Sequence, residues 1–293
     1  MQFRAARATA EPSLGILVGL IGSAPIANKN SGNLMKKTLS TWLAGSALLL
    51  AANSVQAHQI WFEQSPDRTM TFYYGEYDEN MLEVTPGGMD RFKALEGQWL
   101  STAGTAPLTM KLHRDHFTVL QKPGKQDSLL AADKQYPIFQ VKDEGKTVNA
   151  FWTPATRWVS DFSAREPELD LDIVPTGVVN GDQVEFQVFH LHDPLGNVPV
   201  KMSSASGWVL QANTDGEGKV SFKLPWKGTY VLGIEYRDRS EGGERAGLDG
   251  NKEKYDILAY SSSLSFHKAT GLEPLPRADS TLPASEIARL NKK

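Results

Sequence analysis

Histidine is the residue type in this sequence that could do chemistry, because the chain has six histidines and no cysteine. The lack of cysteine excludes disulfides, thiolate metal sites and cysteine nucleophiles. Imidazole nitrogens suit transition-metal ions better than they suit magnesium or calcium. The spacing of the histidines therefore decides whether the sequence predicts a metal site.

His58 follows a stretch that is typical of a signal-peptide cleavage site, with small residues at 55–57 behind an apolar run at 38–52. Cleavage after Ala57 would give His58 a free α-amine. The amine and the imidazole of one residue can chelate a single metal ion, and one more imidazole would complete the three-nitrogen site called a histidine brace. Such a site suits Cu(II) and, less strongly, Ni(II). His58 is thus the first predicted metal ligand.

His113 and His116 form a second candidate pair, in the segment MKLHRDHFTVL. A spacing of three places two side chains on one face of a turn or helical stretch, and on opposite faces of a strand. Asp115 could accept the second ring N–H of a ligating imidazole. The alternative is a solvated turn without a ligand.

His190 and His192 form the third candidate group, in VEFQVFHLHDP. In a strand, both would lie on the same face as the apolar side chains at 184, 186 and 188, so they would continue the core face to its edge. We predict this pair as the best source of a further nitrogen for His58, although histidines at a strand end also pack without any ligand. His267 is expected in an exposed loop after the last strand.

The elements that must position these residues begin after a leader. Residues 35–57 are predicted to be a signal peptide, and residues 1–34 to be upstream sequence from a start codon assigned too early, or part of a longer bipartite leader. The apolar run is too short to span a bilayer, so stable membrane insertion is not expected. Removal of the leader leaves 26 basic and 33 acidic residues, a balance that argues against nucleic acid and is compatible with cations. Export without disulfides indicates a bacterial periplasm or cell surface.

Short alternating runs bounded by turn residues predict an all-β protein after the leader. The runs are Arg68–Tyr77, Thr147–Pro154, Gln183–Pro194, Gly218–Pro225, Gly228–Tyr236 and Ala259–Phe266. A boundary near Pro167–Pro175 predicts an N-terminal β domain at 58–167, a C-terminal β-sandwich at 168–270 and a tail at 271–293. The strand spacing of the second domain favours an immunoglobulin-like or prealbumin-like sandwich.

Three local features complete the prediction of the fold. The segment NTDGEGKVSF places glycines between two strand runs, which predicts a tight hairpin. The segment at 237–256 is charged and contains glycines, so we expect a mobile, exposed loop. The end of the chain, PASEIARLNKK, forms at most a short amphipathic helix.

Several of these segments together resemble a known family. They are AHQIWFE at 57–63, YYGEY at 73–77, LDLDIVPTGVVNGDQVEFQVFHLHDPLGNVPVKM at 169–202 and NTDGEGKVSFKLPWKGTYVLGIEY at 213–236. The chain is similar over most of its length after the leader to periplasmic proteins described as substrate-binding components of nickel or cobalt uptake, which share a domain of unknown function. The resemblance implies an exported β-sandwich protein associated with a transition metal.

Catalysis is not expected, because no G-x-S-x-G, phosphate-binding glycine loop or H-E-x-x-H occurs. The sequence favours a periplasmic protein that binds nickel or cobalt, with copper as a further candidate, and passes the ion to an ABC-type or outer-membrane uptake system. One alternative is a structural or interaction β-sandwich with incidental histidines. Others are a copper histidine-brace oxidase and a binding protein for a small organic ligand or metal chelate held between the two β domains.

Overall fold

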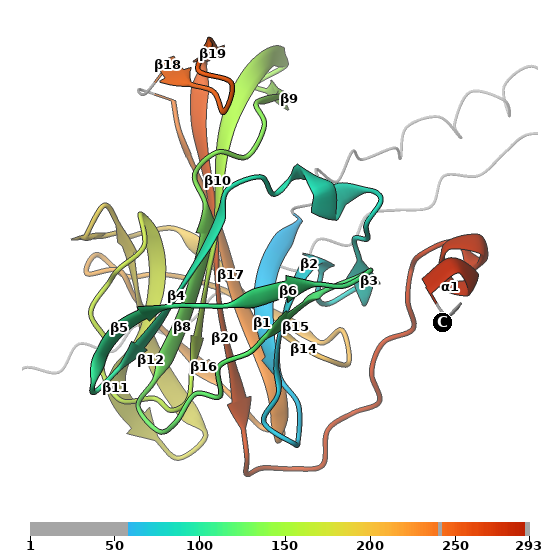
Figure 1. The fold of residues 1–293 in the computed structure, drawn as a ribbon. Helices are drawn as coiled ribbons and strands as arrows, with labels where there is room; N and C mark the ends of the chain where they lie inside the picture. The colour runs from blue at the N-terminus through green and yellow to red at the C-terminus, as the bar shows by residue number, and fades with distance from the viewer. Residues whose placement is uncertain (1–57, 240–241, 291–293) are drawn as a thin grey trace, which may run out of the picture. The chain divides into compact units, whose positions relative to one another are not determined.

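Strands form where the sequence alternates apolar and polar residues, in agreement with the all-β prediction, which is confirmed (Figure 1). A computed structural model describes residues 58–239 and 242–290. The predicted signal peptide at 35–57 and the upstream residues 1–34 lie outside the described residues. The predicted terminal helix is present as α1 (Ala284–Leu290). Among the described residues, no helix is both long enough and apolar enough to cross a membrane.

The first sheet carries the start of the described chain. It contains β1 (Gln59–Gln64), β2 (Met70–Glu76), β3 (Met81–Leu82), β6 (Met110–Leu112) and β7 (Phe117–Val119). The strand order is β1-β2-β7-β6, with β3 paired to β2. A 3-10 helix, η1 (Gly88–Arg91), follows β3.

The second and largest sheet, here called the central sheet, contains nine strands. They are β4 (Leu95–Ser101), β5 (Gly104–Pro107), β8 (Ser128–Asp133), β9 (Phe139–Asp143), β10 (Lys146–Val159), β14 (Pro199–Ser204), β15 (Val209–Asn213), β17 (Gly228–Asp238) and β20 (Ile257–Lys268). The order is β15-β14-β17-β20-β10-β8-β4-β5, with β9 paired to β10.

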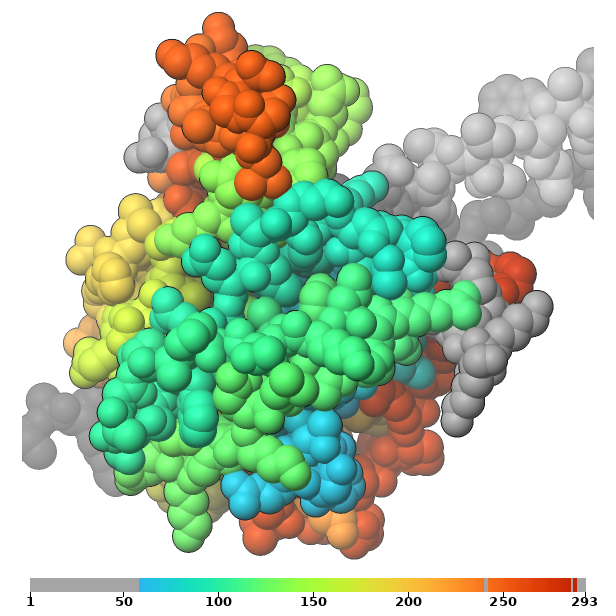
Figure 2. All heavy atoms as spheres, in the orientation of Figure 1, coloured from blue at the N-terminus to red at the C-terminus, as the bar shows by residue number. Residues whose placement is uncertain are grey.

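The third sheet is formed by β11 (Leu171–Asn180), β12 (Gln183–His190), β13 (Asp193–Pro194) and β16 (Lys219–Lys223). A separate two-stranded hairpin consists of β18 (Gly243–Ala246) and β19 (Lys252–Tyr255). In Figure 2 this hairpin, coloured orange, projects at the top of the view beside the light-green segment that contains β9 and the start of β10.

The central sheet takes part in two hydrophobic cores because side chains alternate between the faces of a strand. On β20, Leu264 and Phe266 pack into the core shared with the third sheet. The hydroxyl of Ser263, on the other face, donates to the carbonyl of Ile60 in the first sheet. On β10, Trp152 and Trp158 join the core shared with the first sheet. The described strands therefore form a layered β-sandwich, with the central sheet between the other two.

Strands from both sides of the predicted boundary at 167 share the central sheet. β10 precedes the boundary and pairs in parallel with β20, which follows it, from Ala150–Ile257 to Trp158–Ser265. The division at 167, and the immunoglobulin-like or prealbumin-like character of the second half, stay predictions.

The predicted hairpin around TDGEG is wrong, although the turn itself is present. The amide of Asp215 donates to the carbonyl of Lys219 at 2.9 Å, and the amide of Gly218 donates to the carbonyl of Asp215. The strands on either side then diverge, since β15 pairs with β14 in the central sheet and β16 pairs with β12 in the third sheet. Turn residues specify a reversal of the chain, but the partner of each strand depends on the two cores.

The segment at 237–256 was expected to be a loop, and this expectation is wrong for much of its length. β18 and β19 pair with each other from Gly243–Tyr255 to Ala246–Lys252. The Arg245 guanidinium contacts the Glu253 carboxylate, donates to the Tyr136 carbonyl at 2.8 Å and lies 4.2 Å from the centre of the Phe151 ring. These contacts explain why a polar, glycine-containing segment forms a hairpin.

Gly75 allows β3 to approach β2 beside the start of β1. Its φ is +149°, and a Cβ added there would collide with the carbonyl oxygen of Met81. We expect Gly75→Ala to lower the free energy of unfolding by at least the roughly 1–3 kcal/mol that such a strained backbone costs. Urea denaturation measures this change. Gly216→Ala is the control, because a Cβ there meets open space, and its effect should stay within about 0.5 kcal/mol. Equal effects of the two substitutions would contradict the argument.

Candidate functional site

His58 lies one residue before β1, at the end of the core shared by the first and central sheets. In the antiparallel pairing of β1 with β2, Gln59 faces Gly75 and Ile60 faces Tyr74. The next position of this register places His58 opposite Glu76. Side chains two residues apart share a face, so His58 lies on the same side of the sheet as Ile60, which is buried.

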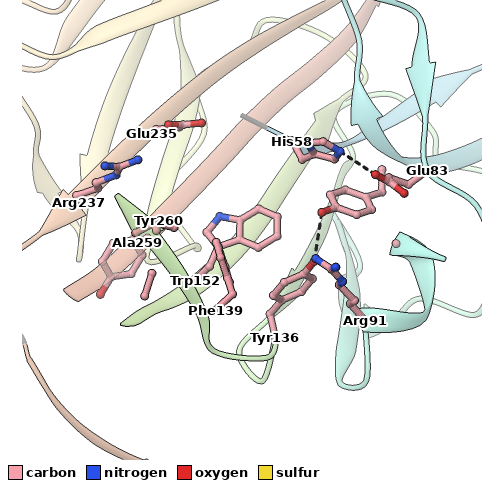
Figure 3. Close-up of a pocket in the computed structure, with 14 residues that line it drawn as sticks. His58, Glu83, Arg91, Tyr136, Phe139, Trp152, Glu235, Arg237, Ala259 and Tyr260 are labelled. Carbon is pink, nitrogen blue, oxygen red and sulfur yellow. Dashed lines mark hydrogen bonds and ion pairs between the residues drawn. The ribbon is translucent and has the colours of Figure 1, made fainter. Parts of the chain in front are cut away.

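The His58 imidazole lies between two carboxylates. Its Nε2 is 2.8 Å from Glu83 Oε1, and its Nδ1 is 3.4 Å from Glu76 Oε1. The His58 ring also packs against Tyr74, with 5.3 Å between ring centres. The His58 side chain is 27% exposed, whereas that of Glu76 is only 8% exposed. In Figure 3 a dashed line joins the His58 ring to the Glu83 carboxylate.

The charge of Glu83 determines which nitrogen of the His58 imidazole carries the proton. The hydrogen bond from His58, assisted by one from the backbone of Gly88, lowers the pKa of the Glu83 carboxyl below its ordinary value. Glu83 is therefore ionised at neutral pH and accepts a hydrogen bond from Nε2–H. In the neutral imidazole this tautomer leaves the lone pair on Nδ1, the nitrogen that faces Glu76.

Two cavities meet at His58. One, here called the aromatic cavity, has a volume of about 370 Å³, and its walls include Tyr74, Tyr136, Phe139 and Trp152. The other, here called the acidic cavity, has a volume of about 330 Å³. Its walls include Glu76, Asp78, Glu79 and Glu235. His58 and Glu235 line both.

His190 lies at the edge of a core, as predicted, but His192 does not continue that face. The His190 ring packs against Tyr236 and Tyr260 at 4.6 and 4.9 Å between ring centres. β12 ends at His190, and the next two residues have positive φ angles, 50° at Leu191 and 72° at His192. A two-residue hairpin turn that leads into β13 requires this backbone, and it leaves the His192 side chain exposed.

His113 and His116 occupy the turn between β6 and β7, in agreement with their spacing. Their rings stack at 4.7 Å with an interplanar angle of 13°. The Nδ1 of His116 lies 2.8 Å from Asp115 Oδ1, the contact expected of a carboxylate that orients an imidazole. His116 also packs against Tyr73, which points to the opposite face of β2 from Tyr74 and His58.

The neighbours of His58 are thus carboxylates that the sequence did not single out. No second histidine among residues 58–239 and 242–290 lines either cavity beside His58. In the same part of the chain, no group of three or more histidine, aspartate or glutamate side chains is arranged to hold a metal ion. The roles predicted for His113, His116, His190 and His192 as metal ligands stay predictions. Glu76 could have been found from the sequence, because the period of two places it on the same strand face as Phe72 and Tyr74. Nothing in the sequence near Glu83 indicates that it lies beside His58.

Comparison with family models and with curated proteins finds no match to this chain.

Proposed function

We propose that this protein is an exported, periplasmic protein that binds a transition-metal ion through His58 and supplies it to an uptake system. Nickel or cobalt is the proposed ion, with copper as the alternative. The observation that carries the proposal is the placement of His58 Nδ1 3.4 Å from the carboxylate oxygen of Glu76, beside two cavities.

This separation suits two ligands of one metal ion. Bonds of about 2.0–2.2 Å at angles of about 90–110° place two ligand atoms roughly 2.8–3.6 Å apart. The distance between His58 Nδ1 and Glu76 Oε1 lies within that range. Glu83, on the other side of the ring, would then act as the outer partner that fixes the tautomer and orientation of a ligating imidazole.

Cleavage after Ala57 would add a third donor at the same place. The α-amine of His58 becomes a ligand only when the peptide bond to Ala57 is broken, so the full-length chain lacks it. Amine, Nδ1 and carboxylate form a mixed nitrogen and oxygen donor set, which suits Ni(II), Co(II) and Cu(II). In this proposal the site is completed by processing, which couples metal binding to export.

The charges around the acidic cavity support binding of a cation. Four carboxylates line it, and Lys201, which also lines it, pairs with Asp78 at 2.7 Å. Such a concentration of negative charge raises the local concentration of cations. The resemblance to nickel and cobalt uptake components favours a carrier that does no chemistry on the ion, with an ABC-type or outer-membrane transporter as its partner.

Calorimetric titration of the metal-free protein that begins at His58, with Ni(II), Co(II) and Cu(II), tests the proposal. We expect one ion per chain. Glu76→Gln should weaken binding by more than the roughly 10–100-fold typical of outer-shell residues. Glu79→Gln removes the same charge from the same cavity and should leave the affinity within about threefold, since Glu79 is not the residue paired with Nδ1.

Absence of binding to the processed protein would contradict the proposal and favour the structural or interaction β-sandwich. Equal losses in Glu76→Gln and Glu79→Gln would contradict a direct ligand role for Glu76, because a general loss of negative charge would then explain both.

A further inference from the structure

The aromatic cavity has the size and walls of a small-molecule site. Tyr74, Tyr136 and Trp152 are buried, and Phe139 lies at the edge. The rings of Tyr136 and Trp152 meet edge to face at 4.6 Å and 83°, and those of Phe139 and Trp152 at 6.3 Å and 90°. A volume of about 370 Å³ with such walls and a few polar groups is the usual form of a pocket for a small organic ligand.

Two arginines line this cavity from different elements. Arg91 ends η1, and Arg237 lies on β17. In the view of Figure 3 they lie on opposite sides of the rings of Tyr136, Phe139 and Trp152. Two positively charged groups therefore line the cavity together with the aromatic rings.

Both guanidinium groups retain hydrogen-bonding capacity. Arg237 donates to Asp143 Oδ1 at 3.1 Å, but Arg239 already contacts both oxygens of that carboxylate, at 2.8 and 2.9 Å. A hydrogen bond to Tyr136 raises the pKa of Arg91, and this bond uses one of its donors. Since each guanidinium carries five N–H donors in a fork that matches a carboxylate, both can bind an anion.

Two acidic residues, Glu83 and Glu235, line the cavity beside these arginines. Glu83 is already bound by His58 and Gly88. Glu235 lines the cavity as well, and desolvation raises the pKa of its carboxyl while the charge of Arg237 lowers it. The guanidinium donors of Arg91 and Arg237 that remain available at the cavity therefore favour a ligand with carboxylate groups.

We propose that the aromatic cavity binds a small planar organic acid, with carboxylates on Arg91 and Arg237 and its ring against Trp152 and Tyr136. Because His58 lines the same cavity, an acid that also chelates metals would share an ion with Nδ1. This second part rests on the proposed function, since it requires a metal ion at His58. The first part requires only the cavity.

Two isomeric probes distinguish binding of the acid by the cavity from sharing of a metal ion with His58. Pyridine-2,6-dicarboxylate chelates metals through its ring nitrogen and both carboxylates, whereas pyridine-3,5-dicarboxylate has the same charge and size but cannot chelate. Titrated calorimetrically into the metal-free protein that begins at His58, both should bind. One equivalent of Ni(II) should then strengthen binding of the 2,6 isomer at least about tenfold and leave the 3,5 isomer unchanged.

Three arginine variants test the contacts. Arg237→Gln and Arg91→Gln should each weaken the binding of both isomers about tenfold, as expected for loss of a charged hydrogen bond. Arg91 is exposed. Arg239→Gln is the matched control, because Arg239 also binds Asp143 but does not line the cavity. It should leave both affinities within about twofold. Thermal unfolding of each variant checks that the fold is retained.

Failure of both isomers to bind metal-free protein at millimolar concentration would overturn the organic-acid site, whatever nickel does. Binding that survives both Arg91→Gln and Arg237→Gln would overturn the assigned contacts. If both isomers bind but nickel alone does not, the proposed metal function fails while the organic-acid site stands. Equal strengthening of both isomers by nickel would overturn the shared ion.

Discussion

A chain that begins at Ala57 should bind nickel more than about 100-fold more weakly than a chain that begins at His58. The additional residue converts the α-amine of His58 into a peptide nitrogen, which must lose an amide proton before it can bind a metal ion. The loss should exceed the roughly 10–100-fold that follows removal of an outer-shell partner, because a direct ligand is removed. The Nδ1 of His58 and the Glu76 carboxylate would remain as a weaker two-point site.

The pH dependence of the two chains provides a second readout. The α-amine and the imidazole must both be unprotonated to bind, and their ordinary pKa values are about 7.7–8.0 and about 6.5. Nickel affinity of the chain that begins at His58 should therefore rise from pH 6 to pH 8, with contributions from both groups. In the chain that begins at Ala57 the rise should be less steep, because the α-amine of His58 no longer contributes.

Calorimetric titration of both chains under identical buffer conditions measures the difference, and matching thermal unfolding curves would show that the added residue leaves the fold intact. Unchanged affinity would exclude the terminal amine as a ligand and shift attention to the stacked pair of His113 and His116.

Asp172→Asn should lower the free energy of unfolding by about 3–5 kcal/mol, the loss typical of breaking a buried ion pair. Arg157 on β10 and Asp172 on β11 are both 0% exposed. Asp172 accepts from Arg157 Nε at 3.0 Å and Nη2 at 2.6 Å, and from the amides of Glu168 and Leu169. The substitution leaves the Arg157 charge buried between the central and third sheets without its counter-ion.

Asp170→Asn is the matched control for this substitution. Asp170 lies two residues away and pairs with Lys134 at 2.9 Å, but the Lys134 side chain is 66% exposed. Exposed pairs of this kind contribute about 0–1 kcal/mol. Replacement of both Arg157 and Asp172 by leucine should cost less than Asp172→Asn alone, since no buried charge remains. Urea denaturation that gave the same loss for Asp172→Asn and Asp170→Asn would refute the role assigned to the buried pair.

The positions of six strands could be predicted from local pattern. The six alternating runs coincide with β2, β10, β12, β16, β17 and β20. Alternation records which side of a strand meets a core, so it also placed His190 correctly at a core edge. It could not place His192, because the two-residue turn after β12 reverses the chain, and its backbone geometry is not encoded in a period of two.

The sequence by itself determined the all-β fold, the absence of cysteine and the choice of histidines as candidate metal ligands. Only the tertiary structure decided which groups surround His58. Glu76 and Glu83 lie 18 and 25 residues further along the chain, and they reach His58 because β1 pairs with β2 and β2 with β3. The tertiary structure also decided that β15 and β16 pair with different strands, β14 and β12. Strand partners are selected by burial in shared cores, a property of the whole chain that no short segment carries.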